Sequence, residues 1–89
     1  MGAYSVTFKP SVEKDLRRLP ASVVSRILVR IEALANAPLS ASAVKLAGAE
    51  KLFRVRVGDY RIIYEINQKA HSVVIHYIRP RRDAYRRLS

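Results

Sequence analysis

Residues 52–66, LFRVRVGDYRIIYEI, largely alternate apolar and polar side chains on both sides of a Gly58-Asp59 dipeptide. A period of two, rich in β-branched and aromatic residues, predicts strands over Leu52–Val57 and Tyr60–Ile66. A glycine-aspartate pair between two such runs favours a tight two-residue turn. The stretch therefore predicts an antiparallel β-hairpin around which the rest of the fold is built.

A third strand follows the hairpin. Ser72–Ile78 is another run of β-branched and aromatic residues, separated from the hairpin by a polar connection at 67–70. This spacing predicts an antiparallel meander of three strands. Pro80 has no backbone N–H and is expected to stop the ladder, after which Arg81–Leu88 forms either a final helical turn or a mobile tail.

The first half of the chain predicts one strand and two helices. Tyr4–Phe8 alternates like a strand, and Ser11 then provides an N-cap for a helix over 12–19 that ends at Pro20. From Asn36 to Glu50 the sequence has no usable period and is predicted to be a connecting loop. Before that loop, a second helix capped by Ser22 carries an apolar stripe of Val23, Ile27, Ile31 and Leu34.

Together these elements predict an α+β fold in a single domain over residues 1–89. The N-terminal strand and the three-stranded meander make a four-stranded sheet, a two-helix hairpin packs on it, and a short C-terminal helical tail follows. A sheet this small must bury one face under the helices, so the other face is left to water or substrate. Because side chains alternate across a strand, Arg54 and Arg56 are expected on the open face, with Val55 between them on the buried one.

The composition narrows the class of protein. The formal net charge is +10 in 89 residues, and residues 1–50 hold seven Lys and Arg against four carboxylates, whereas residues 51–89 hold ten against three. The C-terminal half is therefore expected to bind an anionic partner. With no cysteine and two histidines, neither a disulfide nor a metal cofactor is expected. No apolar run reaches the roughly 20 residues of a membrane span and the N-terminus lacks a signal-peptide layout, which predicts a cytoplasmic protein.

Arginines and tyrosines gather in this half. Arg54 and Arg56 lie about 6–7 Å apart along one side of a strand, and Arg61 lies across the tight turn, an arrangement that suits one phosphate or two adjacent ones. Aromatic rings among arginines are what single-stranded nucleic acid binds by stacking and charge. The alternative is that these arginines only solvate the outer face of the sheet. The other members of the group are Arg79, Arg81, Arg82, Tyr60, Tyr64, Tyr77 and Tyr85.

The histidines and some tyrosines have simpler interpretations. His76 lies in the middle of a strand, where a packed or hydrogen-bonded core histidine is more common than a catalytic base. His71 lies in a turn and is expected to be exposed. Tyr4, Tyr64 and Tyr77 are expected in the core, whereas Tyr85, in an arginine-rich tail, has no core to fill.

Three segments resemble the RelE/ParE superfamily of toxins. They are KLAG at 45–48 followed by LFRVRVGDYRIIYE at 52–65, RPRRDAYR at 79–86, and LRRLP at 16–20. The resemblance spans nearly the whole chain. It implies a toxin of a type II toxin–antitoxin system, with RNA cleavage on the ribosome as the expected activity.

The resemblance also implies a site. In the ribosome-dependent endoribonucleases of this superfamily, basic residues surround the scissile phosphate, and a C-terminal arginine and tyrosine complete the site. The implied reaction is attack of an RNA 2′-hydroxyl on its own 3′-phosphate, giving a 2′,3′-cyclic phosphate and a 5′-hydroxyl end, and it requires no metal. Lys45, Arg79 and Arg82 are expected to contact the substrate. The positions that match the catalytic set are Arg54, Arg56, Arg61, Arg81 and Tyr85.

The sequence departs from the family pattern where a general base is expected. Arg54 and Arg56 stand where the best-known type has lysines, and arginine is too basic to accept a proton at neutral pH. Pro80 stands where many relatives have a histidine. Glu50 follows the KLAG segment, whereas the general-base glutamate of another branch precedes it. The sequence therefore predicts catalysis by charge and positioning without an evident base.

Three functions remain open at this stage. The first is cleavage of mRNA in the ribosomal A site, the second is ParE-like poisoning of DNA gyrase, and the third is an inactive relative or a plain RNA-binding module. The first is favoured because all four charged site positions are basic and Tyr85 is present. The implied partners are the ribosome, mRNA and a cognate acidic RelB-like antitoxin, with a toxin–antitoxin heterotetramer as the implied assembly and no membrane partner.

Overall fold

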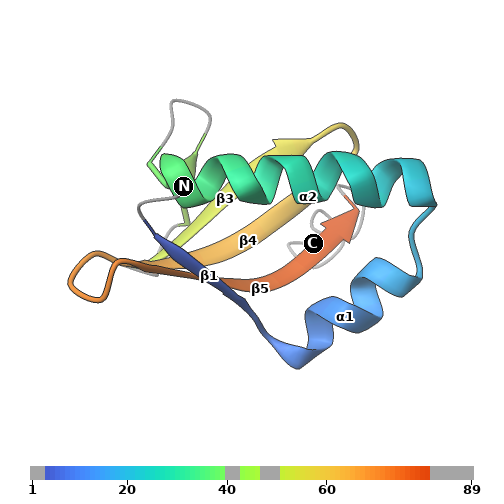
Figure 1. Ribbon diagram of the computed structural model, residues 1–89. Helices are drawn as coiled ribbons and strands as arrows, with labels where there is room; N and C mark the ends of the chain where they lie inside the picture. The colour runs from blue at the N-terminus through green and yellow to red at the C-terminus, as the bar shows by residue number, and fades with distance from the viewer. Residues whose placement is uncertain (1–3, 40–42, 47–50, 81–89) are drawn as a thin grey trace.

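The computed structural model describes residues 4–39, 43–46 and 51–80. It confirms the α+β class and all three strands of the meander. The predicted C-terminal helical tail lies outside the described residues. The elements labelled in Figure 1 are β1 (Ser5–Phe8), α1 (Pro10–Arg17), α2 (Ala21–Asn36), β2 (Val44–Lys45), β3 (Leu52–Val57), β4 (Tyr60–Asn67) and β5 (Ser72–Pro80).

The sheet has five strands in the order β1-β5-β4-β3-β2, so the prediction of four was wrong. The additional strand, β2, lies in the stretch predicted to be a loop and pairs with Phe53 and Arg54 of β3. A strand of two residues is too short to show a period in the sequence. β1 pairs in parallel with β5 and the other pairs are antiparallel, which makes the sheet mixed.

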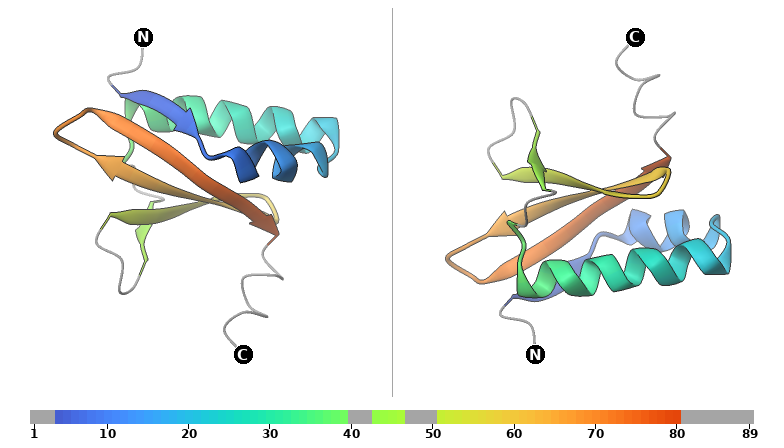
Figure 2. Two further views of the ribbon diagram at one scale, coloured as in Figure 1. Left: turned by 90° about the horizontal axis from the view of Figure 1, so that it is seen from below. Right: turned by 90° about the horizontal axis from the view of Figure 1, so that it is seen from above.

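Both helices lie on one side of the sheet (Figure 2). α1 begins at Pro10, earlier than the predicted 12–19, because proline suits the first turn of a helix. Ser11 is therefore inside the helix instead of at its N-cap, and its hydroxyl donates to the His76 carbonyl on β5 at 3.3 Å. Ser22 provides no cap either, since α2 begins at Ala21 without a side-chain cap. Neither described helix is both long and apolar enough to cross a membrane.

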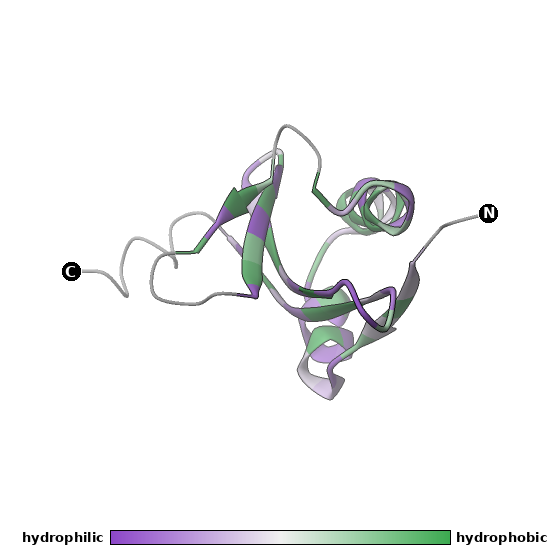
Figure 3. Cartoon of the chain, turned by 90° about the vertical axis from the view of Figure 1, so that its left-hand side faces the viewer, coloured by the Kyte–Doolittle hydropathy of each residue, from purple (hydrophilic) through white to green (hydrophobic). Residues whose placement is uncertain are grey.

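The core lies between the helices and the inner face of the sheet. Figure 3 looks nearly along α2 and shows this helix to one side of the curved sheet. Ile27, Ile31 and Leu34 of the predicted α2 stripe are buried here, and Val23 is half-buried against them. The alternate residues Val55 and Val57 of β3 are also buried, which confirms that Arg54 and Arg56 project to the opposite face of the sheet. The buried core residues are Val12, Ile27, Ile31, Leu34, Val55, Val57, Ile62, Tyr64, Ile66, Val73, Ile75 and Ile78.

α1 covers the part of the β5 edge that β1 leaves open. β1 pairs with β5 only as far as Ile75. Beyond that point, the Asp15 carboxylate on α1 accepts the backbone N–H of Ile78 at 3.1 Å and forms an ion pair with Arg79 at 2.6 Å. Backbone groups two residues apart in a strand point the same way, so the nitrogen of Pro80 also faces outward. Because of this orientation, the missing N–H of Pro80 removes no hydrogen bond to β4, and β5 continues to Pro80. The prediction that the strand ends before Pro80 was therefore wrong.

Tyr64 joins the core to the segment after α2. Its side chain is fully buried, as predicted, and its hydroxyl donates to the Pro38 carbonyl at 2.7 Å. Burial raises the pKa of the Tyr64 phenol to about 12, although the positive charge of Arg30 lowers this pKa in part. The phenol is therefore held protonated in the folded protein.

We expect Tyr64→Phe to lower the free energy of unfolding by about 1–3 kcal/mol at pH 7, because the Pro38 carbonyl loses its donor. In the wild type, the unfolded chain releases the phenolic proton near pH 10 and the folded chain near pH 12. Stability should fall between these values by up to about 1.4 kcal/mol per pH unit from this group. Urea unfolding at pH 7 and above pH 10 measures both effects. A variant with the same pH slope as the wild type would contradict the assignment.

Candidate nucleic-acid interface

Three arginines from three strands form a row across the outer face of the sheet. Arg56 on β3 is opposite Arg61 on β4, and Arg61 is opposite Arg79 on β5. Directly opposed residues project to the same face with their Cβ atoms about 4.5–5.5 Å apart, and like charges placed so closely destabilise a sheet. Asp15 offsets part of this charge at Arg79, and an anion bound along the arginine row would offset more of it.

The members of the arginine row differ in their surroundings. Arg56 is exposed, whereas Arg61 is only 6% exposed despite its charge. Arg79 is half-buried, pairs with Asp15, and has its guanidinium 5.1 Å from the centre of the Tyr77 ring. Burial and these contacts restrict the rotamers of Arg61 and Arg79, so both charges are positioned before any ligand binds.

Arg54 lies in the next row on the same face. It is opposite Ile63, which is opposite Tyr77 on β5. Ile63 thus has Arg54 on one side across the strands and Arg61 two residues away along β4. The structure therefore brings the predicted Arg54, Arg56 and Arg61 together on one face and adds Arg79 to them.

The Gly58-Asp59 turn sets the register of the arginine row. Gly58 has φ +58°, the left-handed region, at the first central position of a two-residue hairpin, where glycine is preferred. Val57 and Tyr60 close the turn as partners, and the next pair along is Arg56 with Arg61. A Cβ at position 58 would also lie 3.3 Å from the Arg26 guanidinium of α2.

Arg26 belongs to a second group of cations that the sequence analysis did not single out. Arg26 and Arg30 of α2 line, together with Arg56, a groove of about 550 Å³ beside the turn. The signal was available, because residues four apart share one face of a helix. Arg56 borders both the groove and the arginine row, so an extended anionic ligand can contact both.

His76 and Glu65 form a hydrogen-bonded pair on the outer face of the sheet. His76 Nε2 lies 3.1 Å from Glu65 Oε1, and both side chains are half-buried. His76 is hydrogen-bonded, as predicted, but it is half-buried on the outer face and is not a core residue. The sequence analysis did not identify Glu65 as its partner. The register between β4 and β5 shifts beside Ile63 and Tyr64, which leaves His76 as the additional residue of a β-bulge.

The remaining predicted site residues lie elsewhere. Lys45 is opposite Phe53, whose ring stacks on Tyr64 of the core with centroids 6.0 Å apart. The register therefore places Lys45 on the opposite side of the sheet from Arg54, and the structure does not bring it to the arginine row. The predicted residues outside the described ranges are Arg81, Arg82 and Tyr85.

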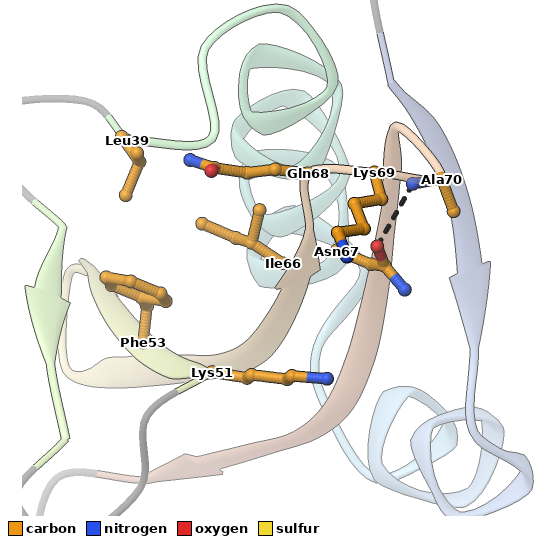
Figure 4. A pocket seen from close by; sticks show the side chains of 8 residues that line it. All are labelled: Leu39, Lys51, Phe53, Ile66, Asn67, Gln68, Lys69 and Ala70. Atoms are coloured by element: carbon orange, nitrogen blue, oxygen red, sulfur yellow. Dashed lines mark hydrogen bonds between the residues drawn. The ribbon is translucent and has the colours of Figure 1, made fainter.

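Another hollow is at the other end of the sheet, beside the connection between β4 and β5 (Figure 4). It measures about 740 Å³, and Leu39, Phe53 and Ile66 supply apolar walls while Lys51 and Lys69 supply positive charge. Among the residues that the structure describes, none of the predicted site residues lines it. We therefore place the candidate interface on the arginine row.

Comparison with known proteins gives a consistent group of relatives. A family model described as the ParE toxin of the type II toxin–antitoxin system parDE matches residues 6–85. Putative toxin RelE1 of Methanocaldococcus jannaschii is 29% identical over 86 residues, which cover 93% of this chain and 96% of the relative. Toxin RelE3 of the same archaeon is 35% identical over 66 residues, which cover 70% of this chain and 75% of the relative. A chain of the archaeal RelE–RelB complex from Pyrococcus horikoshii is 33% identical with a TM-score of 0.80, over 89% of this chain and 96% of that one.

Proposed function

Since the chain belongs to the ParE toxin family, within the RelE/ParE superfamily of type II toxins, we propose that it is a ribosome-dependent endoribonuclease that cleaves mRNA in the A site. Cleavage of the message would inhibit translation. The observation that carries this proposal is the row of Arg56, Arg61 and Arg79 across the outer face of the sheet.

The arginine row supports phosphate chemistry for an electrostatic reason. Attack of an RNA 2′-hydroxyl on its 3′-phosphate builds a dianionic phosphorane, and positioned guanidiniums stabilise that charge. Arg61 is buried and Arg79 is held by Asp15, so both cations need little reorganisation during the reaction. The products are a 2′,3′-cyclic phosphate and a 5′-hydroxyl end. We assign substrate contacts also to Arg54, and to Arg81 and Tyr85 by their match to the family motif.

The same charge supports an acidic antitoxin as the partner. The net charge of +10 favours a segment of opposite sign, and the groove between Arg26, Arg30 and Arg56 extends the cationic surface beyond the sheet. The Pyrococcus horikoshii structure is a complex of RelE with RelB. We propose a RelB-like acidic antitoxin that covers this surface.

A ParE-like poison of DNA gyrase is the second candidate, because the family model that matches the chain is that of the ParE toxin. Such a poison binds a protein target and needs no cations arranged for a phosphate. The arginine row therefore favours the nuclease.

The two functions are separated by assaying one preparation in two ways. Purified toxin is added to an in vitro translation reaction, and primer extension maps cuts in the mRNA. The same toxin is added to DNA gyrase in a supercoiling assay. Codon-phased cuts that depend on the ribosome, with gyrase unaffected, are expected. If supercoiling is lost and no cut appears in the mRNA, the proposal of a nuclease is wrong and the toxin is a gyrase poison.

A further inference from the structure

We propose that His76, oriented by Glu65, is the proton acceptor for the RNA 2′-hydroxyl, and so provides the general base that the sequence alone did not reveal. This inference rests on the proposed nuclease function. It concerns a pair that the family resemblance does not assign and that becomes visible only when β4 and β5 lie side by side.

The hydrogen bond leaves one imidazole nitrogen for chemistry. Glu65 Oε1 lies 3.1 Å from His76 Nε2, and a carboxylate can only accept, so Nε2 carries the hydrogen. In the neutral ring the lone pair is then on Nδ1, which is the atom that can take a proton. A carboxylate behind a histidine fixes the tautomer and the orientation of the ring. The His76 side chain keeps 22% of its exposure, so solvent or substrate can reach it.

The β-bulge explains why His76 lies on this face. Ile63 pairs with Tyr77 and the next residue, Tyr64, pairs with Ile75, so His76 is the additional residue on β5. Bulges re-aim side chains and are over-represented beside active sites. The His76 carbonyl accepts the Ser11 hydroxyl of α1 at 3.3 Å, which ties the bulge to the helix. The fold thus maintains a local irregularity whose result is to place an imidazole on the outer face.

The pair lies next to the cations that would hold the phosphate. On β4, Arg61 and Glu65 are each two residues from Ile63, about 7 Å along the strand, on the same face. Across the strands, Ile63 is flanked by Arg54 and Tyr77. A phosphate held between the Arg54 and Arg61 guanidiniums would therefore have the Glu65–His76 pair within one side-chain length of its ribose.

The reaction balances without a further reagent. The 2′-hydroxyl proton passes to His76 Nδ1 as O2′ forms a bond to phosphorus. The bond from phosphorus to O5′ breaks, water supplies a proton to O5′, and the imidazolium returns its proton to solvent. Arg54 and Arg61 offset the phosphorane charge throughout.

The test is the pH dependence of single-turnover mRNA cleavage on programmed ribosomes. The wild-type rate should rise with pH and then level off, as a reaction does when it needs the deprotonated form of a base. His76→Gln should lower the plateau about 100-fold and abolish the rise. Glu65→Gln should lower the plateau about tenfold, because the ring loses the partner that orients it. The charged and titratable side chains placed around the Glu65–His76 pair are Arg54 on β3, Asp15 on α1, and Tyr77 and Arg79 on β5.

Two further variants separate proton transfer from a structural effect. His71→Asn removes the other histidine, which is exposed in the β4–β5 connection and stacks on Tyr4, and should leave both rate and profile unchanged. In His76→Ala, added imidazole should restore part of the cleavage rate. If His76→Gln fails to fold, this rescue experiment tests whether His76 accepts the proton. If the wild type cleaves mRNA and His76→Gln has the same rate or the same pH profile, the role of His76 is overturned while the nuclease function stands. A wild-type protein that does not cleave mRNA would overturn the nuclease function as well.

Discussion

Replacing Arg61 with alanine is expected to lower mRNA cleavage by a factor of about 100 or more while the protein stays folded. Arg61 is the middle member of the arginine row and is 6% exposed, so its charge is preorganised. Single-turnover primer extension measures the loss, and circular dichroism verifies folding. By the match to the family motif, Arg81→Ala should have an effect of the same size.

The matched control is Arg17→Ala, which removes one arginine from the exposed surface of α1 and should leave cleavage unchanged. Arg54→Ala alone should cost less than Arg61→Ala, because Arg56 covers part of the same charge. The double variant of Arg54 and Arg56 should then lose much more than the two single losses combined. Full toxicity on induction of the Arg61 variant would show that the arginine row serves another purpose.

Association with the acidic antitoxin should slow roughly tenfold or more when the salt concentration rises from about 50 to 500 mM. Opposite net charges steer the encounter, and the Debye length of about 8 Å at physiological ionic strength shortens further as salt is added. Dissociation should change less, because it depends on desolvated short-range contacts. Stopped-flow mixing of the toxin with the proposed RelB-like antitoxin measures both rates.

Two variants with the same change in net charge locate the steering surface. Arg56→Gln removes a charge between the arginine row and the α2 groove, and Arg17→Gln removes one from α1. Only the first should slow association appreciably at low salt. An association rate that is flat in salt, or equal for both variants, would mean that the antitoxin binds away from this surface.

The sequence was most informative where structure is local. The two long strands of the hairpin were predicted within one residue, since alternation and the Gly58-Asp59 turn are both written into neighbouring positions. β2 was not predicted, because two residues carry no period. The pairing of β1 with β5 was not specified either, because no local signal states which distant strand will lie beside Ser5–Phe8.

The candidate site likewise has one part that local sequence predicts and one part that depends on how distant strands pair. The approach of Arg56 to Arg61 followed from the hairpin alone. The addition of Arg79 needed the register between β4 and β5, and the Glu65–His76 pair needed the bulge that shifts this register. Neither is encoded by the spacing of the residues along the chain. The described residues do not test the predicted roles of Arg81, Arg82 and Tyr85.

The parallel pairing of β1 with β5 determines when the sheet can form during synthesis of the chain. Ser5 is the register partner of Ser72, so the first of the described strands has no neighbour in the sheet until the last of them has been made. Contacts between such distant residues form late because a long loop must close first. Asp15 of α1 likewise waits for Ile78 and Arg79. The arginine row is therefore absent from a nascent chain that stops short of residue 79, and a toxin of this fold is assembled only after the ribosome that makes it has nearly completed the described chain.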